Sequence, residues 1–591
     1  MQRPAAASHS EPEPSTTTLP PSVLPPLETD PTIEPVPAFS RRGPLKWTDY
    51  LGCYLPAYDG PHDVGTLTLE LPLPEPYSTY ELSSPMKRHD GKPILELNPS
   101  LMTIFYPVQK RPVEPLWRRA LTMGRLVGGE PRLRWITLAQ IQGYLRFASI
   151  PTWMRCLIIP PLLLAMGPTK LPTRGGAPIC LKEGVQQDGE RRRYKLMIFS
   201  HGLTGNRTCY SQLCGRLAAQ GYVVAAVEHR DGTGSHSVGA ARVGGKTVEK
   251  SVPYVDMADV SSDTRPEDYL IARAFQLELR TVEVLAAAKS LASLARPLPG
   301  WRALRDANLR VRGAPGWAAD DGAQWSDQQW DNFASAVDWD RDVTLAGHSF
   351  GAADVIMAAR HPDRPKSWKR FILYDPWLET LDHCSEKFIR TWRKSSSSEG
   401  PVPPDFPCLI VNSPGFTAWK KHFKRLQDLF IIDRNKSDQF CLFATLGGII
   451  HSSFSDLPVL VEWFVFLSSS NFSISFSLFI SSLIFWGLIM DISLSLNRLW
   501  KLTKKLKVDS QKAIQIITDL TLEFIEYEAA ADRAPSKEAH REKEDQAEAK
   551  NRLQAFLDLH KPQPSHGHPQ HEESLQSLQP GKLLVHFKRF F

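Results

Sequence analysis

Positions 347–351, which read Gly-His-Ser-Phe-Gly, form the pattern in this sequence best suited to chemistry. An apolar run at 343–346 precedes it, and an alanine-rich, helix-like run at 352–359 follows it. A sharp turn from strand to helix exposes the hydroxyl of the serine at its apex, and glycines on either side leave room for the crossing backbone. We therefore expect Ser349 to be a nucleophile on a strained turn. Residues 235–239 have a similar composition but lack the first glycine and a preceding strand.

A serine hydroxyl needs a histidine to accept its proton and a buried carboxylate to orient that histidine. Where the serine lies on such a turn, the acid and then the base follow it along the chain. Asp375 ends the apolar run 371–374, and the next residue is a proline that stops the strand, so Asp375 is the preferred acid. His451 follows the run 440–445 through a glycine-containing loop and is the preferred base.

Other residues fit these roles less well. Asp382 and Asp405 lie in polar segments, whereas His361 and His383 come before the last expected strands. His348 adjoins the nucleophile, and the geometry of the turn is expected to point it away from Ser349.

The negative oxygen of an acyl-transfer intermediate needs N–H donors that are already in position. These are usually the residue after the nucleophile and a residue in the loop after an earlier strand. The amide of Phe350 meets the first requirement. The loop that follows the apolar run 194–199 makes the amide of Leu203 the second donor, although His201 and Gly202 could also form an ordinary turn.

Short apolar runs alternate with helix-like stretches between residues 46 and 527. Such alternation favours a mainly parallel sheet covered by helices, and near-continuous apolar strands are typical of burial on both faces. The expected strands are 102–106, 194–200, 222–227, 343–346, 371–374, 408–412 and 440–445. The expected helices are 209–220, 267–294, 352–360 and 511–527. The predicted fold class is α/β, without a glycine pattern that would cradle a nucleotide.

Three parts are expected along the 591 residues. Residues 1–44 are rich in proline, serine, threonine and glutamate, a composition typical of a disordered extension. Residues 45–530 hold the α/β domain. Residues 531–591 form a charged polar tail that is also expected to be disordered, although 536–550 could form a solvated helix.

Residues 463–490 carry no formal charge and are long enough to cross a bilayer as one helix. The segment contains eight serines, and part of it alternates with a period of two. Three interpretations stay open: a single-pass membrane anchor, a segment that dips into a membrane, and an inserted low-complexity segment such as translated non-coding sequence.

Charge and cysteine content exclude some classes of function. The net charge of +6 comes from 70 basic and 64 acidic residues, so no nucleic-acid partner is expected. The eight cysteines show no CxxC pair, which argues against a disulfide framework. Because the start of the sequence has no apolar signal region, we expect an intracellular, cytoplasmic protein that associates with membranes. The sequence leaves the oligomeric state open.

At these residues the sequence resembles the platelet-activating factor acetylhydrolases, calcium-independent phospholipases A2 with an α/β-hydrolase fold. The resemblance covers seven blocks in the same order: 199–203, 224–231, 273–291, 347–351, 374–377, 411–413 and 451–456. Residues 60–65 and 101–107 resemble the first strands of that family. The polar extensions look like those of its fungal members.

The resemblance implies that Ser349 is the nucleophile, Asp375 the acid and His451 the base, with the amides of Leu203 and Phe350 as oxyanion donors. It implies cleavage of an acetyl or a short or oxidised acyl group from the sn-2 position of phospholipids, through an acyl-enzyme and without a metal or other cofactor. The expected partner is a phospholipid in a membrane or lipid aggregate.

The apolar stretch 150–166 is rich in Trp, Leu and Ile, so it is either the surface that meets lipid or a crossover packed on the core. Two other functions also stay open. One is a general carboxylesterase or lipase of the α/β-hydrolase class. The other is a membrane-anchored interaction protein with impaired catalysis, which the uncharged segment 463–490 suggests.

Overall fold

The computed structural model describes residues 54–111, 133–182, 191–295, 300–312, 325–385, 406–430, 440–460, 508–531, 539–562 and 578–589. Residues 184 and 462 are also described, and residues 83, 244, 245 and 308 are not. The expected extension at 1–44 and the apolar segment 463–490 both lie outside these ranges. Within them, no helix combines the length and the apolar character needed to cross a membrane.

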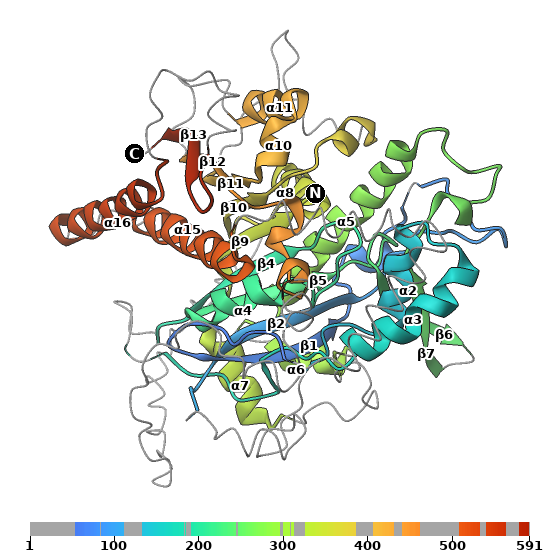
Figure 1. Cartoon of the computed structure of the whole chain (residues 1–591). Helices are drawn as coiled ribbons and strands as arrows, with labels where there is room; N and C mark the ends of the chain where they lie inside the picture. The colour runs from blue at the N-terminus through green and yellow to red at the C-terminus, as the bar shows by residue number, and fades with distance from the viewer. Residues whose placement is uncertain are drawn as a thin grey trace, which may run out of the picture. The chain divides into compact units, whose positions relative to one another are not determined.

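A large sheet forms the centre of the chain after residue 53 (Figure 1). In spatial order its main strands are β1 Asp63–Leu71, β2 Ser100–Val108, β5 Tyr222–Glu228, β4 Tyr194–Ser200, β9 Val337–His348, β10 Trp368–Tyr374, β11 Cys408–Asn412 and β12 Cys441–Leu446. Strand β2 runs antiparallel to its neighbours β1 and β5. The strands β5, β4, β9, β10, β11 and β12 run parallel to one another. This is the α/β-hydrolase arrangement, as the sequence predicts.

Short strands complete the edges. At one edge β3 Arg174–Gly175 and β8 Arg310–Arg312 pair with β1. A separate hairpin is formed by β6 His236–Val243 and β7 Lys246–Pro253.

The opposite edge requires a correction. Strand β13 Leu583–Arg589 pairs antiparallel with β12, and helix α16 Ala539–Leu559 buries Leu553 and Leu557. The α/β domain therefore does not end at residue 530, and the charged tail contributes an edge strand and a packed helix. Buried Leu553 and Leu557 of α16 and buried Leu583 of β13 help to offset the entropy cost of ordering a segment whose average composition is polar.

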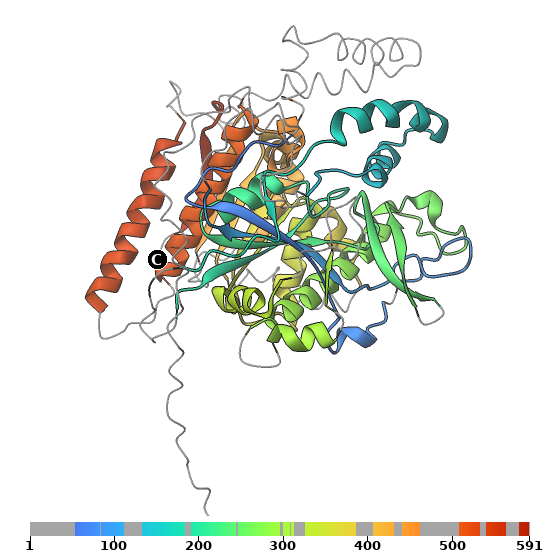
Figure 2. The ribbon, with the colours of Figure 1, turned by 90° about the horizontal axis from the view of Figure 1, so that it is seen from below.

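Helices cover both faces of the sheet. Helices α5 Tyr269–Ala292, α6 Gly300–Asp306, α7 Asp327–Ala336 and α8 Phe350–Arg360 share one core, and α4 Ser211–Ala219, α15 Ser510–Ala531 and α16 share the other. Figure 2 shows α15 and α16 side by side. Along β4, Leu196 and Ile198 belong to the first core and Met197 and Phe199 to the second. This alternation explains why the strand reads as a continuous apolar run.

The remaining elements are short or peripheral: η2 Tyr77–Thr79, α2 Leu138–Phe147, α3 Thr152–Met166, η3 Met257–Asp259, η4 Glu379–His383, α10 Pro414–Ala418, α11 Lys420–Phe430 and η5 His451–Phe454. The stretch 150–166 is thus mostly helix α3. Ile158 and Leu162 pack against the second core, while Trp153 and Leu157 are about half exposed. One face of α3 therefore packs on the core, as one of the two interpretations expects, and the other face is exposed; whether that face meets lipid stays a prediction.

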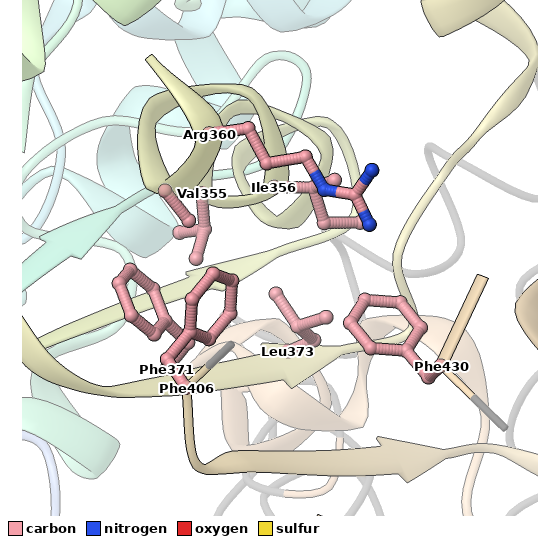
Figure 3. A pocket seen from close by; sticks show the side chains of 8 residues that line it. Val355, Ile356, Arg360, Phe371, Leu373, Phe406 and Phe430 are labelled. Atoms are coloured by element: carbon pink, nitrogen blue, oxygen red, sulfur yellow. The ribbon is translucent and has the colours of Figure 1, made fainter. Parts of the chain in front are cut away.

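An apolar crevice lies between α8 and β10 (Figure 3). Its lining residues are Val355, Ile356, Ala359, Arg360, Phe371, Leu373, Phe406 and Phe430. Ser349, Asp375 and His451 do not line it. We assign it to the packing of α8 on the sheet and not to a binding site.

Candidate active site

Ser349 lies on the sharp turn between β9 and α8 that the sequence predicts. Its backbone angles are φ 57° and ψ −116°, a conformation that non-glycine residues rarely adopt. A Cβ atom added to Gly347 would come within 2.4 Å of the Gly351 carbonyl oxygen, and one added to Gly351 within 2.2 Å of the Ser200 carbonyl oxygen. Both glycines are therefore required by the close approach of neighbouring backbone, which is the reason given by the sequence argument.

His451 reaches the serine. Its Nε2 lies 2.9 Å from Ser349 Oγ, and its Nδ1 lies 3.0 Å from Asp375 Oδ2. The His451 side chain is 42% exposed and that of Asp375 is fully buried. The imidazole of His451 is thus partly open to solvent while its carboxylate partner is shielded from water, which strengthens the interaction between them.

Asp375 follows β10, and the sequence analysis did not identify its other partner, Ser413, just after β11. The backbone N–H of Ser413 donates to Asp375 Oδ1 at 2.6 Å, and its hydroxyl donates to Oδ2 at 2.6 Å. Parallel strands end at the same edge of the sheet, so residues after β10 and β11 meet there. These donors hold the carboxylate in the orientation that receives His451.

The imidazole of His451 contacts two rings. Phe416 of α10 stacks on it with 4.5 Å between centroids and 7° between planes, and the ring of His348 lies 4.5 Å away. The contact of His348 with His451 is not apparent from the sequence, which predicts only that His348 points away from Ser349. Burial and the nearby His451 lower the pKa of His348 well below its usual value, so at neutral pH it adds no second positive charge beside the base.

The loop after β4 packs against the turn that carries Ser349. Gly202 donates its N–H to the Tyr210 hydroxyl at 3.0 Å, and that hydroxyl lies 2.8 Å from His348 Nδ1. A Cβ atom on Gly202 would lie 3.3 Å from the His348 carbonyl oxygen. The structure therefore brings the loop with Leu203 against the turn with Phe350, the two residues expected to supply oxyanion donors.

The weaker sequence candidates lie elsewhere. Asp382 is exposed and pairs with Arg425, and His361 lies near Asp363 after α8. Neither contacts the site formed by Ser349 and His451. Asp405 lies outside the described residues, and His383 ends η4.

His348, Asp375 and His451 place three potential metal-ligating atoms within 4.8 Å of one another. His451 Nδ1 and Asp375 Oδ2 already share a hydrogen bond, and Asp375 accepts two more from Ser413. The donors around Asp375 fit an oriented acid and base pair, which needs no ion.

A family model for platelet-activating factor acetylhydrolase, isoform II, matches residues 135–475, which is more than half of the chain. The chain belongs to this family. A Schizosaccharomyces pombe relative, named as a candidate phospholipase A2, is 24% identical over 441 residues, covering 69% of this chain and 84% of that protein.

The family's vertebrate members match over less of their length. The platelet-activating factor acetylhydrolase of Gallus gallus is 27% identical over 272 residues, covering 45% of this chain and 53% of that protein. The chain therefore spans about half of that relative's length. A ferulic acid esterase from Streptomyces cinnamoneus matches 80% of this chain and 92% of its own with 14% identity and a TM-score of 0.39, which is too low to support a conclusion.

Proposed function

We propose that this member of the family is a serine esterase that removes the acetyl group, or a short or oxidised acyl group, from the sn-2 position of phospholipids related to platelet-activating factor. Its activity would be that of a 1-alkyl-2-acetylglycerophosphocholine esterase. The observation that carries the proposal is the continuous hydrogen-bonded series from Ser349 through His451 to Asp375.

The reaction follows from this geometry. His451 Nε2 takes the proton of Ser349 as Oγ attacks the ester carbonyl carbon, and Asp375 stabilises the imidazolium that forms. The carbonyl oxygen becomes negative and accepts hydrogen bonds from the backbone N–H groups of Leu203 and Phe350. His451 then gives its proton to the departing sn-2 oxygen, which leaves an acyl-serine and a lysophospholipid. Water activated by His451 hydrolyses the acyl-serine and restores the hydroxyl of Ser349.

A lipid surface is the proposed source of substrate. Trp153 and Leu157 of α3 are 54% and 49% exposed, and Phe147 of α2 is 45% exposed. Helix α2 packs tightly on the loop after β5: a Cβ atom on Gly143 would overlap the Ser235 carbonyl. The backbone N–H of Ser235 in turn donates to the Gly205 carbonyl, close to Leu203 in the chain. Exposed apolar side chains at this place fit an interfacial contact beside the site.

This surface has its own test. Trp153→Ser together with Leu157→Ser should weaken sedimentation with phosphatidylcholine vesicles while turnover of a water-soluble acetyl ester stays unchanged. Equal vesicle binding by the wild-type and double-variant proteins would contradict an interfacial role for α3.

The decisive experiment for the esterase function is labelling with a fluorophosphonate, which reacts with activated serines. We expect labelling of the wild-type protein, none of Ser349→Ala, and a strong decrease for His451→Ala. A folded wild-type protein that takes up no probe would refute the esterase function. Turnover of phospholipids with short and with long sn-2 chains, compared with simple acyl esters, separates this activity from that of a general carboxylesterase.

A further inference from the structure

Arg280, in the middle of α5, is fully buried and connects the segments around the proposed site. Its Nε lies 3.0 Å from Asp231 Oδ2, and both side chains have no exposed surface. One terminal nitrogen donates to the His201 carbonyl and the other to the Thr233 hydroxyl. The guanidinium also lies 4.8 Å from the centre of the Phe350 ring.

One of these contacts reaches Phe350, a residue proposed as an oxyanion donor, and another reaches the loop that carries the second donor, Leu203. His201 lies two positions before Leu203, and Phe350 carries the other amide. A third contact supports the same loop, because Thr204 donates its N–H to the Thr233 carbonyl at 2.7 Å. Thr204 has a φ of 61°, so the chain just after Leu203 adopts a conformation that needs support from its surroundings.

An arginine suits this position better than other residues. Its planar fork offers several N–H groups in fixed directions, and here they serve a carboxylate, a carbonyl and a hydroxyl at once. The imidazoles of His201 and His229 are close by, and burial together with Arg280 lowers the pKa of both well below the usual value. These rings stay neutral, so Arg280 supplies the positive charge next to the loop.

We propose that Arg280 is a positioning residue for the reaction: it clamps the loop of Leu203 to the turn of Phe350, so that both amides face the oxyanion at the correct separation. This inference rests on the proposed esterase function and goes beyond it, because Arg280 touches neither the substrate nor Ser349. Loss of one oxyanion donor commonly lowers kcat by about 10² to 10³, and a displaced donor should cost part of that.

The main test is Arg280→Lys, which keeps the charge and loses the fork. We expect kcat for a soluble acetyl ester to fall by about 10-fold to 100-fold, with KM changed by less than about threefold. The affinity for a trifluoromethyl ketone, whose adduct with Ser349 carries an oxyanion, should fall by the same factor. The affinity for the matching trifluoromethyl carbinol, which forms no adduct, should not change.

The matched control is Arg370→Lys. Arg370 is a buried arginine of β10 that pairs with Asp342, far along the strand from Asp375, and its replacement should leave kcat within about twofold. Thr233→Val is a second, milder variant that removes one acceptor of Arg280 and keeps the ion pair with Asp231. We expect it to lower kcat about 3-fold to 10-fold.

The outcomes separate the two proposals. If the wild-type protein turns over ester and folded Arg280→Lys matches Arg370→Lys in kcat and in ketone affinity, the positioning role is refuted and the esterase function stands. If Arg280→Lys does not fold, Thr233→Val decides, and an unchanged kcat overturns the inference. A wild-type protein that neither turns over ester nor reacts with fluorophosphonate refutes the esterase function itself.

Discussion

Replacement of Asp375 by asparagine should move the imidazole proton of His451 from Nδ1 to Nε2. The fixed N–H of Ser413 donates to Oδ1 at 2.6 Å, so the amide oxygen of the new residue will take the Oδ1 position. Its NH2 group then takes the Oδ2 position, 3.0 Å from His451 Nδ1, and the hydroxyl of Ser413 can rotate to accept from it. His451 must accept at Nδ1 and carry its proton on Nε2, where it cannot take the proton of Ser349.

The expected loss is large because both the proton acceptor and the charge behind it disappear. A wrong tautomer with preserved geometry costs about 10⁴ in kcat in the comparable serine hydrolase case. We expect kcat/KM of Asp375→Asn to fall by about 10³ to 10⁴, which corresponds to about 4 to 5.5 kcal/mol of transition-state stabilisation. The variant should stay folded, since an isosteric amide replaces the carboxylate and the backbone N–H of Ser413 keeps its acceptor.

The assay is steady-state hydrolysis of a soluble acetyl ester, with thermal unfolding as the check on folding. Asp382→Asn is the matched control, because Asp382 also follows β10 but is exposed and pairs with Arg425; its activity should stay within about twofold of wild type. If folded Asp375→Asn kept more than about a tenth of the wild-type activity, Asp375 would not be the group that orients His451.

Two further predictions concern neighbours of the site. Burial raises the pKa of Asp354 to about 7, above the 3.8 of the unfolded chain, so its protonated form stabilises the fold at low pH and this contribution is lost as pH rises from about 4 to 7. The measurement is the free energy of unfolding in urea, for the wild-type protein relative to Asp354→Asn. This relative stability should be about 2 kcal/mol lower at pH 8 than at pH 5, and a relative stability that does not change with pH would contradict the prediction. Phe416→Leu removes the ring stacked on His451 and should lower kcat about 3-fold to 10-fold. The control is Phe423→Leu, which alters an aromatic contact with Phe443 and should lower the unfolding temperature without a matching loss of kcat. Equal kcat in both variants would refute a role for the stacking.

Much of the fold could be predicted because its signals are local. Each parallel strand is buried on both faces, so it reads as a short apolar run. All seven expected strands occur, two of them (194–200 and 408–412) with the expected bounds and five with shifted ends. Strand β9 begins at Val337, before the apolar run at 343–346. The sequence does not reveal this first half, because charged residues at 338 and 340–342 interrupt the buried Val337 and Trp339. Strand β13 could not be predicted, since it belongs to the sheet only through its pairing with β12.

The sequence by itself indicates Ser349 as the candidate nucleophile and the order in which its candidate partners follow. A strand, a tight turn with two glycines and a helix are adjacent in the chain, so their meaning at Ser349 does not depend on distant contacts. Asp375 and His451 are candidates because parallel strands end at one edge of the sheet, which brings the residues that follow each strand close together.

Only the tertiary structure decided which distant residues support this site. Ser413, Phe416, Tyr210 and Arg280 lie in different elements, and no spacing in the chain relates them to Ser349. Their roles come from distances of a few ångströms between segments far apart in sequence. Hydrogen bonds and ring stacking act only over such short distances, so contacts between these segments exist only in the folded chain and cannot be predicted from spacing in the sequence.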